Sequence, residues 1–356
     1  MPTAKNSGKD RQLRLLAAVI VAGGALIAYW PSFAGKFFLD DDAAIIANPH
    51  LHQLVPIWPL LNPPGWMATL AGRPLLSLSL ALNWAWGGDS VLGYHVVNFA
   101  IHAAAGVLVW LILQRLLTLP AMGERVRRSA WWLATVSALL WTLHPLQTES
   151  VTYIVQRAEC MAGMFFLLSM YAFLAGSLGS DVPGRWYFLS VISCLLAMGT
   201  KESGAMIPLA ILLLDRSFLS ESWQRCFSRG RGLVYGSLFG CWLFQGLLMF
   251  SSNKRGATAG FGLGISSWEY AVSQFGIITR YLRLTFVPYP QVLDYGVWLA
   301  KSPEEIWPYA LLIGVLVLGT LWMTYRDPRW GYGGLLFWLT LGPTSSVVPL
   351  VTQTAA

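Results

Sequence analysis

The stretch LRLLAAVIVAGGALIAYWPS, residues 13–32, decides the fold of this chain. It carries a single charge, and about twenty predominantly apolar residues are what a helix needs to cross the hydrocarbon core of a bilayer. Basic residues precede and open it, at Lys5, Lys9, Arg11 and Arg14. Such charges are retained on the cytoplasmic side of a membrane. No small-residue cleavage site clearly follows, so we expect an uncleaved anchor helix, Leu13–Ser32, with a cytoplasmic N-terminus.

The composition extends this interpretation to the whole chain. Of its 356 residues, 55% are apolar and 12% are charged, and the mean hydropathy is +0.54. A soluble protein of this size has about 25% charged residues, so the sequence predicts an integral membrane protein. Eighteen Trp and thirteen Tyr suit aromatic belts at the two membrane interfaces. The four cysteines lack metal-binding spacing, and we expect inert thiols packed among helices.

The net charge of +7 raises the question of a nucleic-acid partner. The basic residues fall in short stretches between apolar runs, which is the pattern of cytoplasmic loops. Since no soluble basic face is left to bind nucleic acid, we expect no such partner.

Apolar runs separated by basic loops predict nine membrane spans. These are Leu13–Ser32, Tyr94–Leu113, Ala130–Leu143, Glu159–Gly176, Trp186–Thr200, Ala205–Leu214, Leu233–Phe250, Ile306–Tyr325 and Gly333–Leu350. The segment Ser267–Phe286 contains Glu269, Arg280 and Arg283, which suit an amphipathic helix on the outer surface better than a span. If that segment crosses instead, the positive-inside pattern worsens. The expected fold class is all-α, a polytopic bundle of about nine to eleven transmembrane helices with additional interfacial helices.

Residues 1–356 are expected to form a single transmembrane domain. By this topology, residues 33–93 and 251–305 form two long external loops. The apolar piece Leu75–Trp86 in the first loop is about a dozen residues long, which is too short to span. We therefore expect interfacial helices in both loops.

Nearly all the acidic motifs fall on one side of this topology. The sides were assigned from Lys/Arg position and span length alone, yet the outer side collects Asp40–Asp42, His144–Glu149, Glu159 and Lys201-Glu202. Scattered structural ion pairs would not need to gather in this way. The sequence therefore predicts one external polar site.

The triplet Asp40-Asp41-Asp42 has three interpretations. It could be a solvated turn at a helix end. It could bind a hard cation, but such ions take several oxygen ligands and here only adjacent positions offer them. It could supply a general base that removes a proton from an acceptor hydroxyl. We favour the general base.

Five cations lie on the outer side, where Lys and Arg are the minority: Arg73, Arg157, Lys201, Arg280 and Arg283. A phosphate or carboxylate partner would explain them, because the arginine fork binds phosphate with two parallel hydrogen bonds. The alternative is contact with lipid headgroups or ion pairs within the protein. Lys201 with Glu202 or Glu159 is an example.

The histidines allow two interpretations as well. His95 and His102 lie seven residues apart, on roughly one helix face, with Asn98 between them. We favour hydrogen-bonded intramembrane histidines over metal ligands, since no third ligand with zinc spacing follows. His144 precedes Pro145 and is either a helix cap or a donor facing a phosphate. Walker A, GxGxxG and GxSxG patterns are absent from the sequence, which argues against nucleotide-driven pumps and the common serine hydrolases.

The motifs together resemble a known family. Residues 37–48, FFLDDDAAIIAN, are similar to the F-x-x-D-D-x-x-A-I-x-x-N stretch of the transmembrane-and-TPR protein O-mannosyltransferases. Further matches follow in order: Arg73-Pro74-Leu75, Tyr94-His95 with Asn98 and His102, His144–Val151, Gln156–Glu159, Lys201-Glu202 with Pro208, and Gly342-Pro343. The resemblance covers nearly the whole chain. It is to a bacterial member without the tetratricopeptide repeats that usually follow.

This resemblance implies a GT-C fold and a glycosyltransferase of the EC 2.4 type. It implies transfer of a sugar from a polyprenyl-phosphate carrier to a Ser/Thr hydroxyl of a protein, with inversion, on the extracytoplasmic side of the cell (inner) membrane. The family's paired acidic residues fall on Asp41 and Asp40, one of which is the expected base, while Asp42 falls on a variable position.

The expected substrate-binding residues are Arg73, His95, His144, Glu149, Arg157, Glu159, Lys201, Glu202 and Arg280. The expected partners are the polyprenyl-phosphate sugar lipid, a protein or peptide acceptor and membrane lipids. No resident metal or cofactor is expected. The alternatives are a flippase or transporter of polyprenyl-linked lipid and a non-catalytic membrane subunit. A transporter predicts a second polar cluster near the inner side or midplane, where the sequence has few carboxylates.

Overall fold

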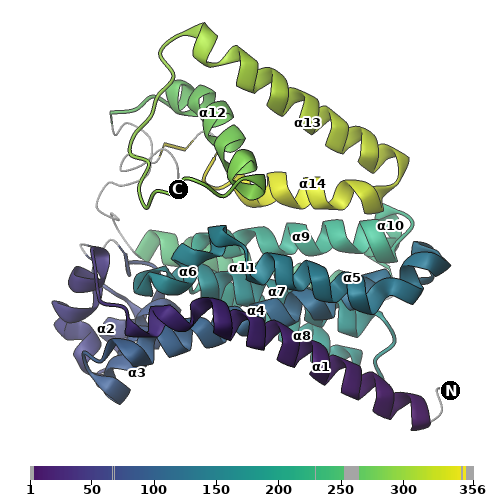
Figure 1. Cartoon of the computed structure of the whole chain (residues 1–356), viewed down its shortest axis with the longest axis horizontal. Helices are drawn as coiled ribbons and strands as arrows, with labels where there is room; N and C mark the ends of the chain where they lie inside the picture. The colour runs from purple at the N-terminus through teal and green to yellow at the C-terminus, as the bar shows by residue number, and fades with distance from the viewer. Residues whose placement is uncertain are drawn as a thin grey trace. The chain divides into compact units, whose positions relative to one another are not determined.

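A computed structural model describes residues 4–65, 67, 69–228, 230–251, 264–345 and 348–349 (Figure 1). All regular structure in these ranges is helical, and none of these residues forms a strand. The chain divides into two compact units. The first unit comprises Met1–Leu61 and Arg73–Gly204, and the second comprises Asn62–Gly72 and Ala205–Ala356. The expected all-α fold class is confirmed in the described part of the chain.

The first unit is built around a central long helix. Its helices are α1 (Ala4–Tyr29), α2 (Trp58–Leu61), α3 (Pro74–Gly87), α4 (Val91–Leu117), α5 (Glu124–Thr142), α6 (Thr148–Thr152), α7 (Arg157–Ser177) and α8 (Pro183–Met198). Helix α4 packs against α1, α5 and α7, and α7 packs along α8. In Figure 1, α1 runs in purple beside α4.

Small residues let these helices approach closely. At Gly106 on α4, a Cβ atom would lie 2.3 Å from Thr142 Oγ1 and 2.9 Å from Val21 Cγ1, so only glycine fits between α5 and α1. Close backbone approach through small residues is a main source of helix association in membranes, where apolar burial drives little. Hydroxyls add to it between α7 and α8, because Ser169 Oγ donates to the Ser190 carbonyl at 2.8 Å and Ser190 Oγ to the Ser169 carbonyl at 2.9 Å.

The second unit contains α9 (Ile207–Leu214), α10 (Trp223–Cys226), α11 (Arg231–Ser251), α12 (Ser267–Phe286), α13 (Trp307–Arg326) and α14 (Pro328–Leu341). Helices α13 and α14 form a hairpin, drawn in yellow-green and yellow (Figure 1). Asp327 caps α14 by accepting a hydrogen bond from Arg329 N at 3.1 Å. Its carboxylate also binds the Arg329 side chain, which holds its pKa below the usual range. A charged helix cap therefore fixes the turn of the hairpin.

Within the described residues, five helical segments are long and apolar enough to cross a membrane. They are Arg11–Ala34, Val91–Leu117, Ile154–Ser177, Arg231–Phe250 and Pro303–Arg326. Each contains one of the predicted spans: Leu13–Ser32, Tyr94–Leu113, Glu159–Gly176, Leu233–Phe250 and Ile306–Tyr325.

The predicted count of nine to eleven transmembrane helices is not confirmed. Helices α8, α9 and α14 fall on predicted spans but have 16, 8 and 14 residues, fewer than the roughly twenty that span a bilayer. Helix α5 is longer, but its first turns carry four charged residues, Glu124, Arg125, Arg127 and Arg128. Residues 346, 347 and 350 of the last predicted span lie outside the described residues.

The segments expected to lie at the interface are helical. Helix α12 has the bounds predicted for the amphipathic helix, and Ser266 and Glu269 form a capping box at its start. One face of α12 is buried through Tyr270, Ile277 and Leu284. It is not among the helices apolar enough to span. Residues 252–263 of the second predicted external loop lie outside the described residues.

Candidate functional site

The two ends of the first unit differ in chemistry. One end has the C-terminus of α4 and the starts of α5 and α8, and carries the arginines Arg115, Arg125, Arg127, Arg128 and Arg185. The other end has the C-termini of α1, α5 and α8 and the starts of α4 and α7. Two contacts join helices here: Tyr29 Oη at the end of α1 donates to the Thr142 carbonyl at the end of α5 at 3.4 Å, and Leu75 N at the start of α3 donates to the Gly199 carbonyl, just after α8, at 2.9 Å. We call this second end the polar end.

The aspartates lie at the polar end, in a loop with an unusual backbone. Leu39 has φ 50°, in the left-handed region that costs an L-residue with a side chain about 1–2 kcal/mol. Two contacts to Tyr153 hold the loop there. Asp40 N donates to Tyr153 Oη at 3.1 Å, and the Phe38 ring packs on the Tyr153 ring with centroids 4.5 Å apart. A π-helical turn, Asp42–Ile46, follows. We call residues 35–48 the aspartate loop.

Neighbouring aspartates in this loop face different surroundings. Asp41 is fully buried, whereas Asp40 and Asp42 are exposed. Asp41 Oδ1 accepts from Val155 N at 2.9 Å, and Oδ2 accepts from Phe38 N at 3.3 Å. Asp41 thereby ties the aspartate loop to the turn that leads into α7.

Burial changes the acidity of Asp41. It raises the pKa of this carboxyl from 3.8 to about 6. Hydrogen bonds from the backbone N–H groups of Val155, Phe38 and Ile154 oppose the rise, and the neighbouring charge of Asp40 adds to it. Desolvation therefore outweighs the hydrogen bonds that favour the charged form.

Arg157, at the first turn of α7, is fully buried and bound entirely by protein groups. Its Nε donates to Asn98 Oδ1 at 2.6 Å and its Nη2 to the Tyr94 carbonyl at 3.1 Å. Its Nη1 reaches the carbonyl and the hydroxyl of Ser79, at 3.2 and 3.0 Å. Instead of facing the outside, as expected for a phosphate ligand, its guanidinium joins α3, α4 and α7. Asn98 adds to this junction by donating to the carbonyls of Val151 and Ile154.

Two ion pairs bring together predicted residues that are distant in sequence. Lys201, just after α8, pairs with Glu159 on α7. Glu202 pairs with Arg73, the residue before α3, at 3.3 Å. Burial lowers the pKa of Arg73 to about 10. We call these four residues the ion-pair cluster.

Glu149 adjoins this cluster. Partial burial raises its pKa, while a hydrogen bond from Gln156 and the charge of Lys201 oppose the rise. Gln156 Nε2 donates to Glu149 Oε1 at 3.3 Å. The segment 149–159 therefore binds the aspartate loop through Val155 and supplies Glu159 to the ion-pair cluster, while Glu149 lies within the electrostatic influence of Lys201.

The histidines take three different roles. His102 Nε2 lies 2.9 Å from the Thr142 carbonyl, and its ring stacks on Trp141. His144 caps a short 3₁₀ turn, with Nδ1 accepting from Leu146 N at 3.2 Å. His95 is buried, and neither ring nitrogen has a hydrogen-bond partner among the described residues. A Cβ on Gly35 would lie 2.7 Å from its Nε2, so the loop backbone rests directly on this ring.

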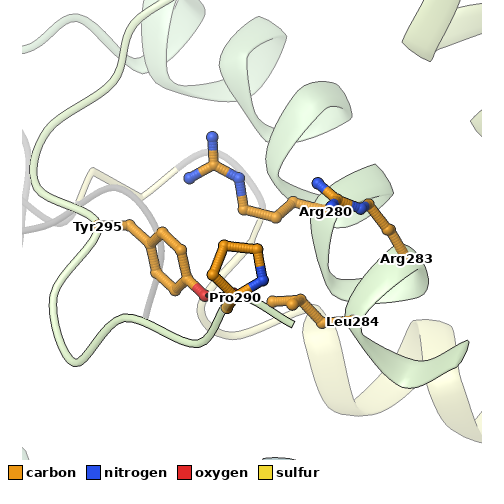
Figure 2. A pocket seen from close by; sticks show the side chains of 5 residues that line it. All are labelled: Arg280, Arg283, Leu284, Pro290 and Tyr295. Atoms are coloured by element: carbon orange, nitrogen blue, oxygen red, sulfur yellow. Dashed lines mark hydrogen bonds between the residues drawn. The ribbon is translucent and has the colours of Figure 1, made fainter. Parts of the chain in front are cut away.

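The other predicted site residues belong to the first unit, and Arg280 belongs to the second. There it lines a pocket between α12 and the chain that follows (Figure 2). In the described part of the chain, no three His, Cys, Asp or Glu side chains gather as a metal site would require.

Sequence reasoning missed two residues of the polar end. Tyr153 holds the aspartate loop and Ser79 binds Arg157. Tyr153 lies between the motifs His144–Val151 and Gln156–Glu159, and that position was the available signal. Ser79 lies in an apolar helix with no signal of its own.

The fold and this site define a class: a helical membrane protein with charged and polar residues gathered around an aspartate loop at one end of its helices. Comparison with known proteins identifies relatives. The chain is 30% identical to human protein O-mannosyl-transferase TMTC4 over 238 residues, 61% of this chain and 32% of that protein. It is 25% identical to human protein O-mannosyl-transferase TMTC3 over 319 residues, 83% of this chain and 32% of that protein.

A protein O-mannosyl-transferase of Caenorhabditis elegans is 25% identical over 325 residues, 88% of this chain and 44% of that protein. The resemblance to the transmembrane-and-TPR O-mannosyltransferases is therefore confirmed, with the chain spanning about a third of the length of the first two relatives. No family model matches the chain. No solved structure matches it either.

Proposed function

We propose that this chain is a membrane glycosyltransferase that moves a sugar, mannose by the names of its relatives, from polyprenyl phosphate to a protein Ser/Thr hydroxyl. The active site is the polar end, facing out of the cytoplasm. The observation that carries the proposal is the aspartate loop. It presents the exposed carboxylate of Asp40 on a backbone fixed by its buried neighbour Asp41, and the segment that holds Asp41 also contacts the ion-pair cluster.

Asp40 is the general base. It is exposed, and its backbone N–H is fixed by Tyr153. Burial raises the pKa of Asp41 toward neutral, but its two oxygens already accept backbone hydrogen bonds and its side chain is fully buried. A base must first reach the proton that it removes, so accessibility is a stronger criterion for the base than pKa. Asp41 is therefore a positioning residue.

The reaction balances with these groups. The acceptor hydroxyl transfers its proton to Asp40 as its oxygen forms a bond to the anomeric carbon. The bond from that carbon to the phosphate oxygen breaks on the opposite face, so the configuration inverts. Polyprenyl phosphate leaves with the bonding electron pair.

The leaving phosphate needs positive charge placed in advance, since fixed donors stabilise developing charge most effectively. Lys201 and Arg73 supply it. Lys201 is paired with Glu159, and Arg73 with Glu202. Each carboxylate orients its cation and compensates the positive charge. Their side chains remain about one fifth exposed, at 21% and 18%.

Two histidines support this arrangement. His144 Nδ1 accepts a backbone hydrogen bond from Leu146 N, which fixes the orientation of the ring at the polar end. His95 supports the aspartate loop at Gly35. Arg157 positions the start of α7.

A lipid transporter is the competing function, and one observation favours it. A second buried polar group exists in the second unit. Asp215 accepts hydrogen bonds from Arg231 at 2.6 Å, Ser220 at 2.8 Å and Tyr235 at 2.6 Å. These groups satisfy one another and join the turn after α9 to α11. A fully satisfied network of this kind makes a structural junction, and we retain the transferase.

The test is sugar transfer by purified protein from a radiolabelled mannosyl polyprenyl phosphate to a Ser/Thr peptide. Asp40→Asn should reduce kcat about 10²- to 10⁴-fold, the contribution of a general base. The matched control is Asp42→Asn, which makes the same change at an exposed neighbour and should retain activity. Full activity in Asp40→Asn would remove the base assignment. Donor movement across vesicles without any transfer would favour the transporter.

A further inference from the structure

The second unit contains a basic pocket that the transfer reaction does not use. Its volume is about 240 Å³, and it is lined by Arg280, Arg283, Leu284, Pro290 and Tyr295. In Figure 2 both arginines project from the last turns of α12, and the Tyr295 ring stands across from Arg280. Pockets for whole small molecules usually measure about 300–1,000 Å³. This one suits a small charged group.

The pocket is held open by an anchored chain. Tyr295 faces the Arg280 guanidinium, with 4.9 Å from Cζ to the ring centroid, and Arg283 Nη2 donates to the Tyr289 carbonyl at 3.4 Å. Further on, Ala300 N donates to Ser273 Oγ at 2.9 Å, and a Cβ on Gly276 would lie 2.9 Å from the Trp298 ring. Contacts at both ends therefore fix the wall of the pocket that faces α12.

The lining selects for an anion. It contains two guanidinium groups and no carboxylate. Neither arginine forms a salt bridge with any residue that the structure describes. The C-terminus of α12 stabilises the charge of Arg283, which lies in the last turn, and does not neutralise it. An arginine pair with unused donors is a binding site for the oxygens of a phosphate ester.

The rim identifies the source of that phosphate. Large apolar side chains of the segment that carries the lining residues Leu284, Pro290 and Tyr295 are exposed: Phe286 82%, Val287 54%, Tyr289 77%, Val292 50% and Leu293 45%. Exposed apolar side chains beside arginines on an amphipathic helix are typical of a segment immersed in the headgroup region of a bilayer. A soluble anion would gain nothing from this rim, whereas the glycerol and upper acyl chains of a phospholipid would cover it.

We propose that the pocket binds the phosphate of an anionic bilayer phospholipid and thereby fixes α12 at the membrane surface. Its lining residues are different from Lys201 and Arg73, the cations proposed to face the carrier phosphate. The experiment that tests this site therefore measures lipid binding and not sugar transfer.

The experiment measures thermal stability of the purified chain in a neutral detergent against increasing short-chain phosphatidylglycerol. The lipid should raise the midpoint of wild type saturably, because a ligand that binds the folded state stabilises it. Arg280→Gln/Arg283→Gln should need roughly tenfold more lipid or more for the same shift. The control Arg125→Gln/Arg127→Gln removes the same charge from the exposed start of α5 and should respond as wild type.

Three results would overturn the proposal. One is an equal lipid response in Arg280→Gln/Arg283→Gln. Another is an equal shift with inorganic phosphate alone, which would make the ligand a soluble anion. The third is displacement of the phospholipid by equimolar polyprenyl phosphate, which would return Arg280 to the donor site. If the double variant does not fold, a photoactivatable phosphatidylglycerol is used on wild type. Labelling of residues 280–297 supports the site, and its absence there refutes it.

Discussion

Replacing Asp41 by Asn should separate the folding role of this residue from its role in the reaction. The Asp41 carboxyl is fully buried, and burial raises its pKa from 3.8 to about 6. Because the folded state holds this proton more tightly than the unfolded state, the contribution of Asp41 to wild-type stability is highest at low pH. It falls as the pH rises from about 4 through about 6. Asparagine has no charge and does not follow this dependence.

The size of the stability difference between Asp41→Asn and wild type follows from the pKa shift of Asp41. About two pKa units at 1.36 kcal/mol each give a cost of at most about 3 kcal/mol for the ionised carboxylate at neutral pH. Asparagine Oδ1 can still accept from Val155 N, but its amide cannot accept from Phe38 N, which loses a hydrogen bond of about 1 kcal/mol. Near pH 8, Asp41→Asn should therefore equal wild type or exceed its free energy of unfolding by up to about 2 kcal/mol. Near pH 4 the wild-type cost is gone, and the variant should be about 1 kcal/mol less stable.

The assay is thermal unfolding of both proteins in one detergent across this pH range, with Asp42→Asn as the exposed control. The stability difference between Asp41→Asn and wild type should grow with pH and change sign or reach zero. Sugar transfer should fall in Asp41→Asn even where the variant is the more stable protein, since the aspartate loop loses one of its anchors. A stability difference that stays constant with pH would refute the reasoning, because it would mean that burial does not perturb this carboxyl.

Three further outcomes follow from the first unit. Arg157→Lys should lower the free energy of unfolding by about 3–5 kcal/mol, because a lysine cannot donate to all four acceptors and leaves some of them buried without a partner. Thermal unfolding should show a lower midpoint, and the yield of folded protein should fall. Gly106→Ala should cost about 1–3 kcal/mol by forcing α1 and α5 away from α4, while Gly163→Ala, where no neighbour lies within 4 Å, should leave the midpoint unchanged or higher. Lys201→Gln should raise KM for the lipid-linked donor roughly tenfold or more, and an unchanged KM would exclude Lys201 from phosphate binding.

Much of the polar end could be predicted from charge position alone. Basic loops fix the direction of each span, and the direction fixes which end of the helix a motif occupies. That reasoning placed Asp41, Glu159 and Lys201 together, and the structure joins them through the segment 149–159. The partners within each ion pair could not be predicted, because one cation near several carboxylates can pair with any of them. The sequence allowed Lys201 with Glu202 or Glu159, and the structure pairs it with Glu159.

Arg157 illustrates what charge position cannot predict. An arginine at the outer end of a span suggests a ligand facing water. Its partners in the structure are an amide, a hydroxyl and two carbonyls, drawn from Ser79, Tyr94 and Asn98. Backbone carbonyls leave no mark in a sequence, so a neutral set of acceptors for a buried cation could not be foreseen. The same limit applies to the span count, because hydropathy marks the apolar runs at α8, α9 and α14 but not where each helix ends.

In the proposed mechanism, the assignment of the base to Asp40 and not Asp41 shows why an adjacent acidic pair is useful in such a site. A base must be fixed in position and yet remain accessible, and one carboxylate cannot easily do both, since every hydrogen bond that fixes it also occupies a lone pair. Here Asp41 is used for position, with both oxygens on backbone N–H groups, while Tyr153 fixes the backbone of Asp40 and leaves its side chain exposed. The left-handed backbone at Leu39 lies directly before the pair, and these contacts offset its cost. The strain is therefore part of the arrangement that exposes one carboxylate and buries the next.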